Sequence, residues 1–110
     1  MPARIRIHRW DEIALEKVTE MISRKIVAGE REMLAQIYLK RGALVPMHAH
    51  ESEQMTYILQ GALRFLIEGE VLHIPSRVPH QSEALEDTLE LDVFSPIRAE
   101  WVEAADEGNL

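Results

Sequence analysis

The chain contains no cysteine, so it can form neither a disulfide framework nor a thiolate metal site or nucleophile. Any metal ion must therefore be held by nitrogen and oxygen donors. Basic side chains are also scarce, because 12 lysines and arginines stand against 19 acids. The resulting formal charge of -7 works against sequence-independent binding to phosphate backbones. We therefore expect no nucleic-acid partner.

Long apolar runs are absent as well. No stretch approaches the roughly 18 apolar residues of a membrane span, and the charged N-terminal sequence MPARIRIHRWDEIALEK has no apolar signal-peptide region. These features predict a soluble, cytoplasmic protein that does not bind a membrane. With 110 residues and 46% apolar content, the chain is long enough for one domain with one modest core, which we assign to residues 1–110.

Short apolar runs broken by glycine, proline and charged pairs dominate the chain, and this pattern is typical of strands. The strand candidates are SRKIVAG and EMLAQIYLKRG around the turn GERE, the two halves of MTYILQGALRFLI divided by Gly61, EVLHIP, and TLELDVFSP. Many short strands with few helical stretches predict an all-β sandwich or barrel. Residues 99–110 are expected to form a frayed or helical tail.

The run TLELDVFSP alternates in character along its length. Because successive strand side chains point to opposite faces, one face carries Leu89, Leu91 and Val93, and the other carries Glu90, Asp92 and Phe94. An acid and an aromatic ring on one face suit the wall of a binding site. Asp92 and Phe94 are therefore candidate site residues.

Two of the five histidines lie two residues apart in VPMHAH. If this segment is extended, His48 and His50 point to the same side, as two imidazoles must to bind one ion. Gln54 can return its amide oxygen after a bend. In IPSRVPHQ, two prolines flank a tight connection that would place His80 at a strand end. These four side chains are the predicted metal ligands, whereas His73 is expected to be an ordinary strand residue.

The four donors predict a single divalent ion, and Zn, Ni, Fe and Mn all accept them. An amide oxygen is a weak, neutral ligand, so three histidines and one glutamine leave the full charge of the ion uncompensated. Such an ion is a strong Lewis acid that polarises bound oxygen atoms or lowers the pKa of a coordinated water.

Two segments resemble the motifs of the cupin family. Residues 42–61, GALVPMHAHESEQMTYILQG, match the first motif in spacing, with Gln54 where most cupins have glutamate. Residues 69–84, GEVLHIPSRVPHQSEA, resemble the second motif and keep His80, although Arg77 stands where glycine is usual and Ala84 where asparagine is usual. The resemblance spans residues 24–98 and implies a cupin barrel, the double-stranded β-helix or jelly-roll fold.

A narrower resemblance is to the pectin-degradation cupins, which help to convert 4,5-unsaturated uronates into open-chain keto forms. These proteins share the His, His, Gln, His metal set, followed by a strand similar to LDVFSP and then an arginine. The resemblance implies that Arg98 binds a uronate carboxylate, that Asp92 moves protons, and that Phe94 packs against the sugar.

The interval between the two motifs is unusually short. Only ALRFLIE separates Gly61 from Gly69, whereas cupins ordinarily have room there for a strand, a turn and a returning strand. Losing one strand reverses the direction of the next, so we expect His80 to emerge at the wrong end of the barrel. Either the remaining strands rearrange, or the shortening was engineered, or a segment near residues 67–71 is missing from the sequence. We favour the last explanation.

The leading hypothesis for function is a metal-dependent enzyme that opens and tautomerises a 4,5-unsaturated uronate. One alternative is an Fe(II)-dependent dioxygenase of a small molecule, which would need open positions on the iron. Another is a non-catalytic module that binds a small carboxylate or sugar acid. The family resemblance further implies a homodimer.

Overall fold

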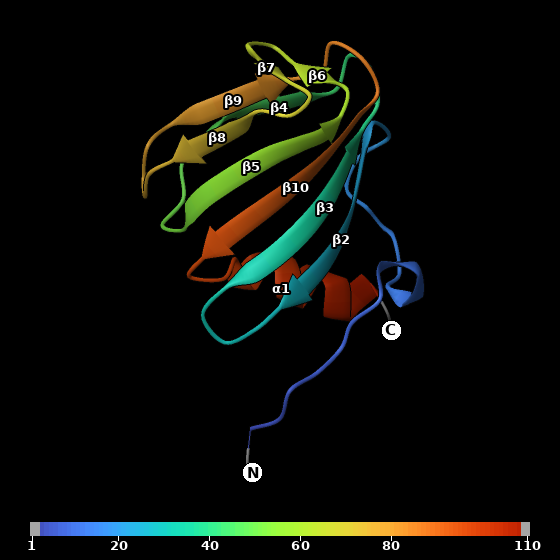
Figure 1. The fold of residues 1–110 in the computed structure, drawn as a ribbon, viewed down its shortest axis with the longest axis vertical. Coiled ribbons are helices and arrows are strands. Elements are labelled where there is room, and N and C mark those ends of the chain that lie inside the picture. The colour runs from blue at the N-terminus through green and yellow to red at the C-terminus, as the bar shows by residue number, and fades with distance from the viewer. Residues whose placement is uncertain (1–2, 109–110) are drawn as a thin grey trace.

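Across residues 3–108, which the computed structural model describes, the chain forms ten strands, one short 3-10 helix and one α-helix. Six strands make the main sheet in the order β1-β2-β3-β10-β5-β8 (Figure 1). Their bounds are β1 (Glu16–Lys17), β2 (Ile22–Ala28), β3 (Met33–Leu39), β10 (Thr88–Ser95), β5 (Glu53–Gln60) and β8 (Val71–Ile74). All neighbours in this sheet are antiparallel.

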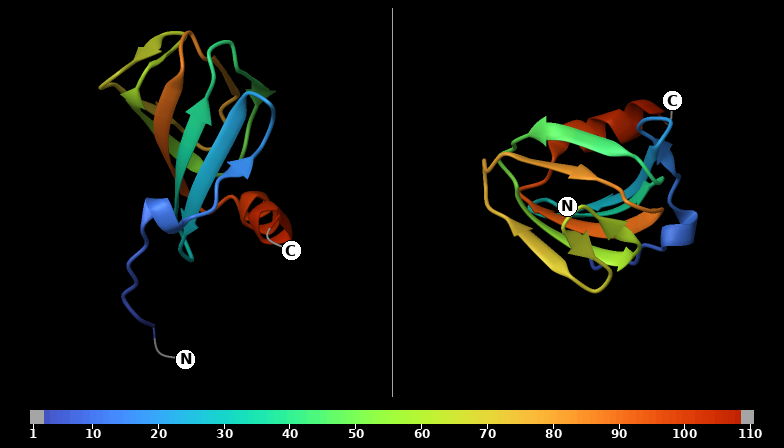
Figure 2. Two further views of the ribbon diagram at one scale, coloured as in Figure 1. Left: turned by 90° about the vertical axis from the view of Figure 1, so that its right-hand side faces the viewer. Right: turned by 90° about the horizontal axis from the view of Figure 1, so that it is seen from above.

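A second, two-stranded sheet faces the main one and closes the barrel. It pairs β4 (Leu44–His48) with β9 (His80–Glu83) in antiparallel fashion. Figure 2 shows, in the view from above, these two strands lying opposite the curved main sheet. This arrangement confirms the predicted all-β, jelly-roll barrel.

The inner faces of β3, β5 and β10 meet inside the barrel, because alternate residues along each of these strands are buried. Strand β3 contributes apolar side chains, whereas β5 and β10 bring both apolar and polar ones inward. The apolar core consists of Met33, Ala35, Ile37, Leu39, Ala43, Ile58, Leu63, Leu66, Ala84 and Phe94. The face of TLELDVFSP that carries Glu90, Asp92 and Phe94 is the one that points into the barrel, since all three residues are buried.

The helices lie at the two ends of the chain. A short 3-10 helix, η1 (Trp10–Glu12), precedes β1, and the predicted helical tail forms α1 (Ala99–Gly108). In Figure 1, α1 passes behind the lower ends of β2 and β3. No helix within residues 3–108 combines the length and apolar character that crossing a bilayer requires.

The short interval between the motifs folds into two strands rather than one. Strands β6 (Ala62–Leu63) and β7 (Leu66–Ile67) form a miniature antiparallel hairpin. A tight turn follows, in which the Glu70 N–H donates to the Ile67 carbonyl over 3.0 Å. The chain reverses its direction once, in net terms, between the two strands, so β8 runs antiparallel to β5.

The expectation that His80 emerges at the wrong end of the barrel is therefore wrong. Cross-strand pairing of β4 with β9 places His80 directly beside His48. The rearrangement of the remaining strands accounts for this fold. The missing segment near residues 67–71 stays a prediction.

The backbone conformations at Gly61 and Arg77 show why cupin motifs usually have glycine at these two positions. Gly61, the last residue of the first motif, has φ +99°, and a Cβ there would lie 2.6 Å from Thr88 Oγ1 and against the Asp87 carbonyl. Arg77 stands where the second motif usually has glycine, and its φ of 65° is in the left-handed region. An L residue pays roughly 1–2 kcal/mol for this conformation, whereas glycine adopts it freely.

Replacing Arg77 with glycine is therefore expected to stabilise the protein. We expect Arg77→Gly to raise the free energy of unfolding by up to about 1 kcal/mol, measured by urea denaturation. Arg31→Gly is the matched control, because Arg31 is also an exposed turn residue but lacks a positive φ. Equal destabilisation by both substitutions would contradict the strain at residue 77.

Candidate metal centre

Three imidazoles converge at one end of the barrel. His48 ends β4, His50 lies in the loop before β5, and His80 begins β9. Their ring centroids are 5.5 Å apart for His48 and His50, 4.2 Å for His48 and His80, and 4.9 Å for His50 and His80. One ligating nitrogen from each lies within 4.8 Å of the others. The two histidines of the HxH pair thus face the same side, as the sequence predicts.

Each of the three rings is oriented by its own backbone. The Nδ1 atom lies 2.8 Å from a carbonyl oxygen two residues away in every case: Pro46 for His48, Ser52 for His50 and Val78 for His80. A carbonyl only accepts hydrogen bonds, so each Nδ1 carries the proton. The lone pair of each neutral ring is consequently on Nε2, which is the arrangement that metal-binding histidines use.

Gln54 completes the donor set from β5. Its amide nitrogen donates to Thr56 Oγ1 over 2.8 Å, which turns the amide oxygen toward His50. That oxygen lies 3.0 Å from His50 Nε2. With Nδ1 protonated, this contact joins two lone pairs and has no hydrogen between them. Two ligands bound at right angles, each about 2.1 Å from one ion, lie about 3 Å apart, so a shared cation resolves the contact.

His80 supplies an independent sign of a missing partner. Its Nε2 atom is buried and has no hydrogen-bond partner among the described residues. Burial is the main cause that lowers the pKa of His80, with further lowering by His48 and His50. A neutral imidazole with an unsatisfied, inward-facing lone pair fits a metal ion.

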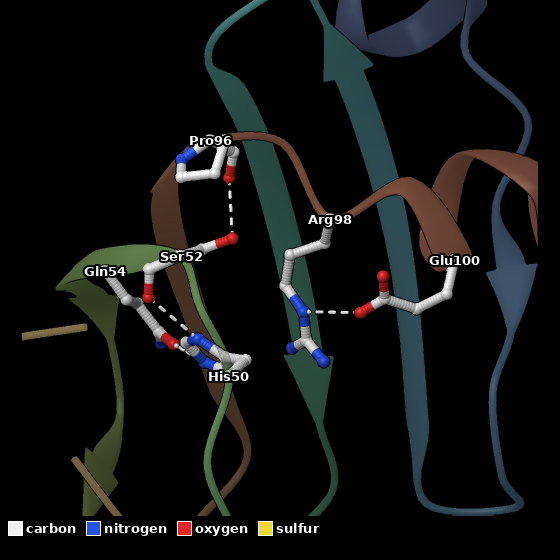
Figure 3. A network of polar contacts seen from close by, with 6 residues as sticks. All are labelled: His50, Ser52, Gln54, Pro96, Arg98 and Glu100. Carbon is white, nitrogen blue, oxygen red and sulfur yellow. Dashed lines mark hydrogen bonds and ion pairs between the residues drawn. The ribbon is translucent and has the colours of Figure 1, made fainter. Parts of the chain in front are cut away.

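The loop that carries His50 is tied to the end of β10. Ser52 accepts from His50 through its carbonyl, and its hydroxyl donates to the Pro96 carbonyl over 2.6 Å (Figure 3). Because Ser52 is buried, neither bond competes strongly with water. The metal end of the barrel and the segment leading to Arg98 are therefore held together.

A cavity of about 230 Å³ lies beside the histidines. His48, Gln54 and His80 line it together with the polar side chains Arg24, Glu90 and Asp92. The apolar part of its wall includes Ile37, Phe94 and Trp101. The cavity therefore places acid, base and apolar groups within reach of one small molecule.

Asp92 is linked to the metal ligands through a hydroxyl. Thr56 Oγ1 accepts from Gln54 and donates to Asp92 Oδ1 over 2.7 Å. Burial raises the pKa of Asp92, while hydrogen bonds from Glu90 and Thr56 and the positive charge of Arg98 oppose that rise. Asp92 is therefore a buried carboxyl whose proton affinity is set by its neighbours.

Arg98 lies just before α1, at the edge of this site. Its Nε donates to Glu100 over 2.9 Å, as Figure 3 shows. The guanidinium carbon lies 4.5 Å from the Trp101 ring centroid and 5.5 Å from that of Phe94. Arg24 also stacks on Trp101, at 4.1 Å, and is paired bidentately with Glu16. Arg24 lines the cavity, whereas Arg98 stands outside its lining.

Comparison with solved structures identifies the family. An RmlC-like cupin from Shewanella frigidimarina NCIMB 400 has 20% identity and a TM-score of 0.80, over 89% of this chain and 96% of the other. The KdgF protein from Halomonas sp. has 32% identity and a TM-score of 0.76, over 84% of this chain and 96% of KdgF.

The chain is a cupin. The oxalate decarboxylase of Bacillus subtilis shares its fold, with a TM-score of 0.70 and 20% identity, over 79% of this chain and 28% of that one. No family model matches this cupin, and a search of curated proteins also finds no match.

The structure brings all seven predicted site residues of this cupin into one region. The metal-ligand candidates His48, His50, Gln54 and His80 converge, and Asp92 and Phe94 lie on the adjoining wall. The cupin fold and the three-histidine cluster support a divalent metal ion. His73 lies outside the cluster and pairs with Glu53 on the surface, as expected for an ordinary strand residue.

Four further residues of the site were missed from the sequence. Glu90 was placed on the correct face but given no role, although strict alternation with Asp92 was the available signal. Thr56, Arg24 and Trp101 carry no comparable signal. Trp101 packs on Phe94 at 5.0 Å between ring centroids and also lines the cavity.

The histidine cluster leads to a prediction about metal binding. We expect Zn(II) or Mn(II) at about 100 times its dissociation constant to stabilise the protein by about 2.7 kcal/mol, observed as a rise in melting temperature. His80→Ala is expected to remove this rise, because it deletes one of three imidazoles. His73→Ala, outside the cluster, is expected to retain it. A metal-induced rise that survives in His80→Ala would place the ion elsewhere.

Proposed function

We propose that this cupin is a metal-dependent enzyme that opens and tautomerises the ring of a 4,5-unsaturated uronate. The observation that carries the proposal is the placement of a buried, hydrogen-bonded Asp92 one hydroxyl away from the Gln54 ligand, in a cavity lined by two of the histidines. The resemblance of LDVFSPIR to the pectin-degradation cupins supplies the substrate class. The similarity to KdgF over most of both chains is consistent with that resemblance.

The reaction is an isomerisation and needs no oxidant or reductant. The C1 hydroxyl of the sugar loses a proton, the bond between C1 and the ring oxygen breaks, and C1 becomes an aldehyde. The ring oxygen stays on C5 as an enolate. Addition of a proton at C4 then gives the C5 ketone. One proton therefore leaves an oxygen atom and one is delivered to a carbon atom.

Asp92 is suited to this proton movement. Its raised pKa brings it closer to neutrality, where a carboxyl both accepts and returns a proton efficiently. The Thr56 hydroxyl occupies Oδ1 and fixes the orientation of the carboxyl group. A bound divalent ion would act as a Lewis acid that polarises the sugar oxygens.

Arg98 is suited to holding the substrate carboxylate. Only its Nε is engaged by Glu100, and no hydrogen bond to either terminal nitrogen is recorded among the described residues. These two nitrogens form the fork that binds a carboxylate bidentately. The packing of the guanidinium on Trp101 and Phe94 limits its orientations, while Phe94 also offers an apolar wall to the sugar ring.

The dioxygenase alternative has less support from the donor set. The common facial arrangement for Fe(II) oxygenases uses two histidines and one carboxylate. Here the fourth donor is an amide, and both nearby carboxyls point into the cavity as part of its wall. The uronate reaction is therefore the function that we propose.

Loss of ultraviolet absorbance tests this function, because the conjugated double bond of a 4,5-unsaturated galacturonate disappears on conversion to the keto form. We expect metal-loaded protein to accelerate the loss, and chelation or His50→Ala to abolish the acceleration. Asp92→Asn is expected to lower kcat by at least about 100-fold, since general acid–base groups contribute this much. A wild-type rate equal to that of buffer would refute the proposed reaction.

The role of Arg98 has its own test. Loss of a charged hydrogen bond costs about 1.5–3 kcal/mol, so Arg98→Ala is expected to reduce kcat/KM about 10- to 100-fold. Metal content should be unchanged, because Arg98 is not a ligand candidate. Arg31→Ala is the control, as an exposed arginine distant in sequence from the site. Unchanged kinetics in Arg98→Ala would refute carboxylate binding by this residue.

A further inference from the structure

Glu90 is a buried carboxyl for which the proposed reaction has no use so far. It is only 6% exposed, and Asp92, two residues further along β10, is 4% exposed. Residues two apart on a strand point to the same face, so both carboxyls face the barrel interior and line the same cavity. Two carboxyls two residues apart on the same face of a strand, in a poorly solvated site, cannot both ionise easily, because their negative charges repel each other.

Among the residues that the structure describes, none forms an ion pair with Glu90. The cross-strand pairing puts Ile37 opposite Glu90 on one side and Ile58 on the other. Arg24 is one strand further away, opposite Ile37, and its guanidinium is already paired with Glu16. Neighbouring strands are about 4.8 Å apart, so the backbones of Arg24 and Glu90 are separated by roughly 10 Å across the sheet.

The other charged or titratable groups of the cavity lie toward the metal end. Arg98 and His50 lower the pKa of Asp92 but have no effect on that of Glu90, and the rings of His48 and His80 lie beside that of His50. The ligand candidate Gln54 is opposite Phe94 in the strand register, four residues along β10 from Glu90. Glu90 therefore has one polar partner among these groups, the carboxyl of Asp92.

We propose that Glu90 remains a neutral carboxylic acid whose hydroxyl donates a hydrogen bond to the Asp92 carboxylate. Thr56 donates to the same carboxylate from the opposite strand, so Asp92 is held between two donors. The assignment of the proton follows from the surroundings, because Thr56, Arg98 and His50 favour the charged form of Asp92 only. Burial, the adjacent charge of Asp92 and the shared hydrogen bond all raise the pKa of Glu90.

Glu90 is then a positioning residue. It fixes the rotation of the Asp92 carboxyl, and it keeps a second negative charge out of a cavity that must admit an anionic sugar. This catalytic consequence rests on the proposed function. The protonation of Glu90 itself does not, and it can be measured without a substrate.

The pH dependence of stability provides that measurement. A carboxyl whose pKa is raised by folding contributes stability below its unfolded pKa, and this contribution is lost as pH rises through the folded pKa. We therefore expect Glu90 to lower the melting temperature of wild-type, metal-free protein, relative to a variant that cannot ionise at this position, as pH rises above the usual range of a glutamate. Glu90→Gln keeps a donor but cannot ionise, so its melting temperature should fall less, and its advantage over wild type should grow with pH.

The control is Glu68→Gln, because Glu68 is an exposed glutamate in the turn before β8. Its melting curve is expected to run parallel to that of wild type. Infrared spectra at neutral pH give a second readout, since a protonated carboxyl has a distinct C=O band. That band should be present in wild type and lost in Glu90→Gln. Parallel melting curves for Glu90→Gln and wild type, or a band that persists in this variant, would overturn the inference.

Kinetics then separate positioning from mere stability. If the uronate is turned over, Glu90→Gln should retain kcat within about threefold because it preserves a donor, whereas Glu90→Leu should lose at least about tenfold in kcat with little change in KM. Equal loss in both variants would overturn the positioning role. Absence of turnover in the wild-type protein would refute the proposed function, while divergent melting curves would still support the neutral Glu90.

Discussion

The orientation of three histidine rings by backbone carbonyls is the constraint on which the site depends. Each Nδ1 is engaged two residues away in the chain, so each Nε2 faces the same point. The histidines come from β4, the following loop and β9, and only the closed barrel brings these segments together. The fold thus brings the lone pairs of three imidazoles together, and the buried Nε2 of His80, which has no hydrogen-bond partner among the described residues, fits a metal ligand.

A chain of side-chain hydrogen bonds runs from the histidine cluster into the interior of the barrel. Gln54 is aimed by Thr56, and Thr56 in turn restrains Asp92. Asp92 adjoins Glu90, whose other neighbours across the sheet are isoleucines. Such a network is stable only when each buried group has a partner, and this requirement gives the two carboxyls their unequal protonation.

The sequence was sufficient to group His48, His50 and Gln54, because their spacing reflects local geometry. Histidines at 48 and 50 share a side, and the alternation over residues 88–95 already separated Asp92 and Phe94 from the outer face. The secondary structure of the interval between the two motifs could not be predicted from such spacing. Strands β6 and β7 have two residues each, too few to display any period, so their hairpin and its effect on direction were invisible.

Trp101 and Arg24 were missed for a different reason. Each becomes part of the site through a contact between different elements of the fold: Trp101 of α1 packs on Phe94 of β10, and Arg24 of β2 stacks on Trp101, which is far from it in the chain. Such packing cannot be predicted from the residues that precede and follow Trp101 or Arg24 in the sequence. Long-range contacts of this kind are set by the closure of the barrel and the return of α1 against it.

Anomalous diffraction from crystals of the metal-loaded protein would test the central claim most directly, since it locates the ion without reference to any substrate. The account predicts one strong peak within about 2.0–2.3 Å of Nε2 of His48, His50 and His80 and of the Gln54 amide oxygen. A peak at the surface pair His73 and Glu53, or no peak at the histidine cluster, would contradict it.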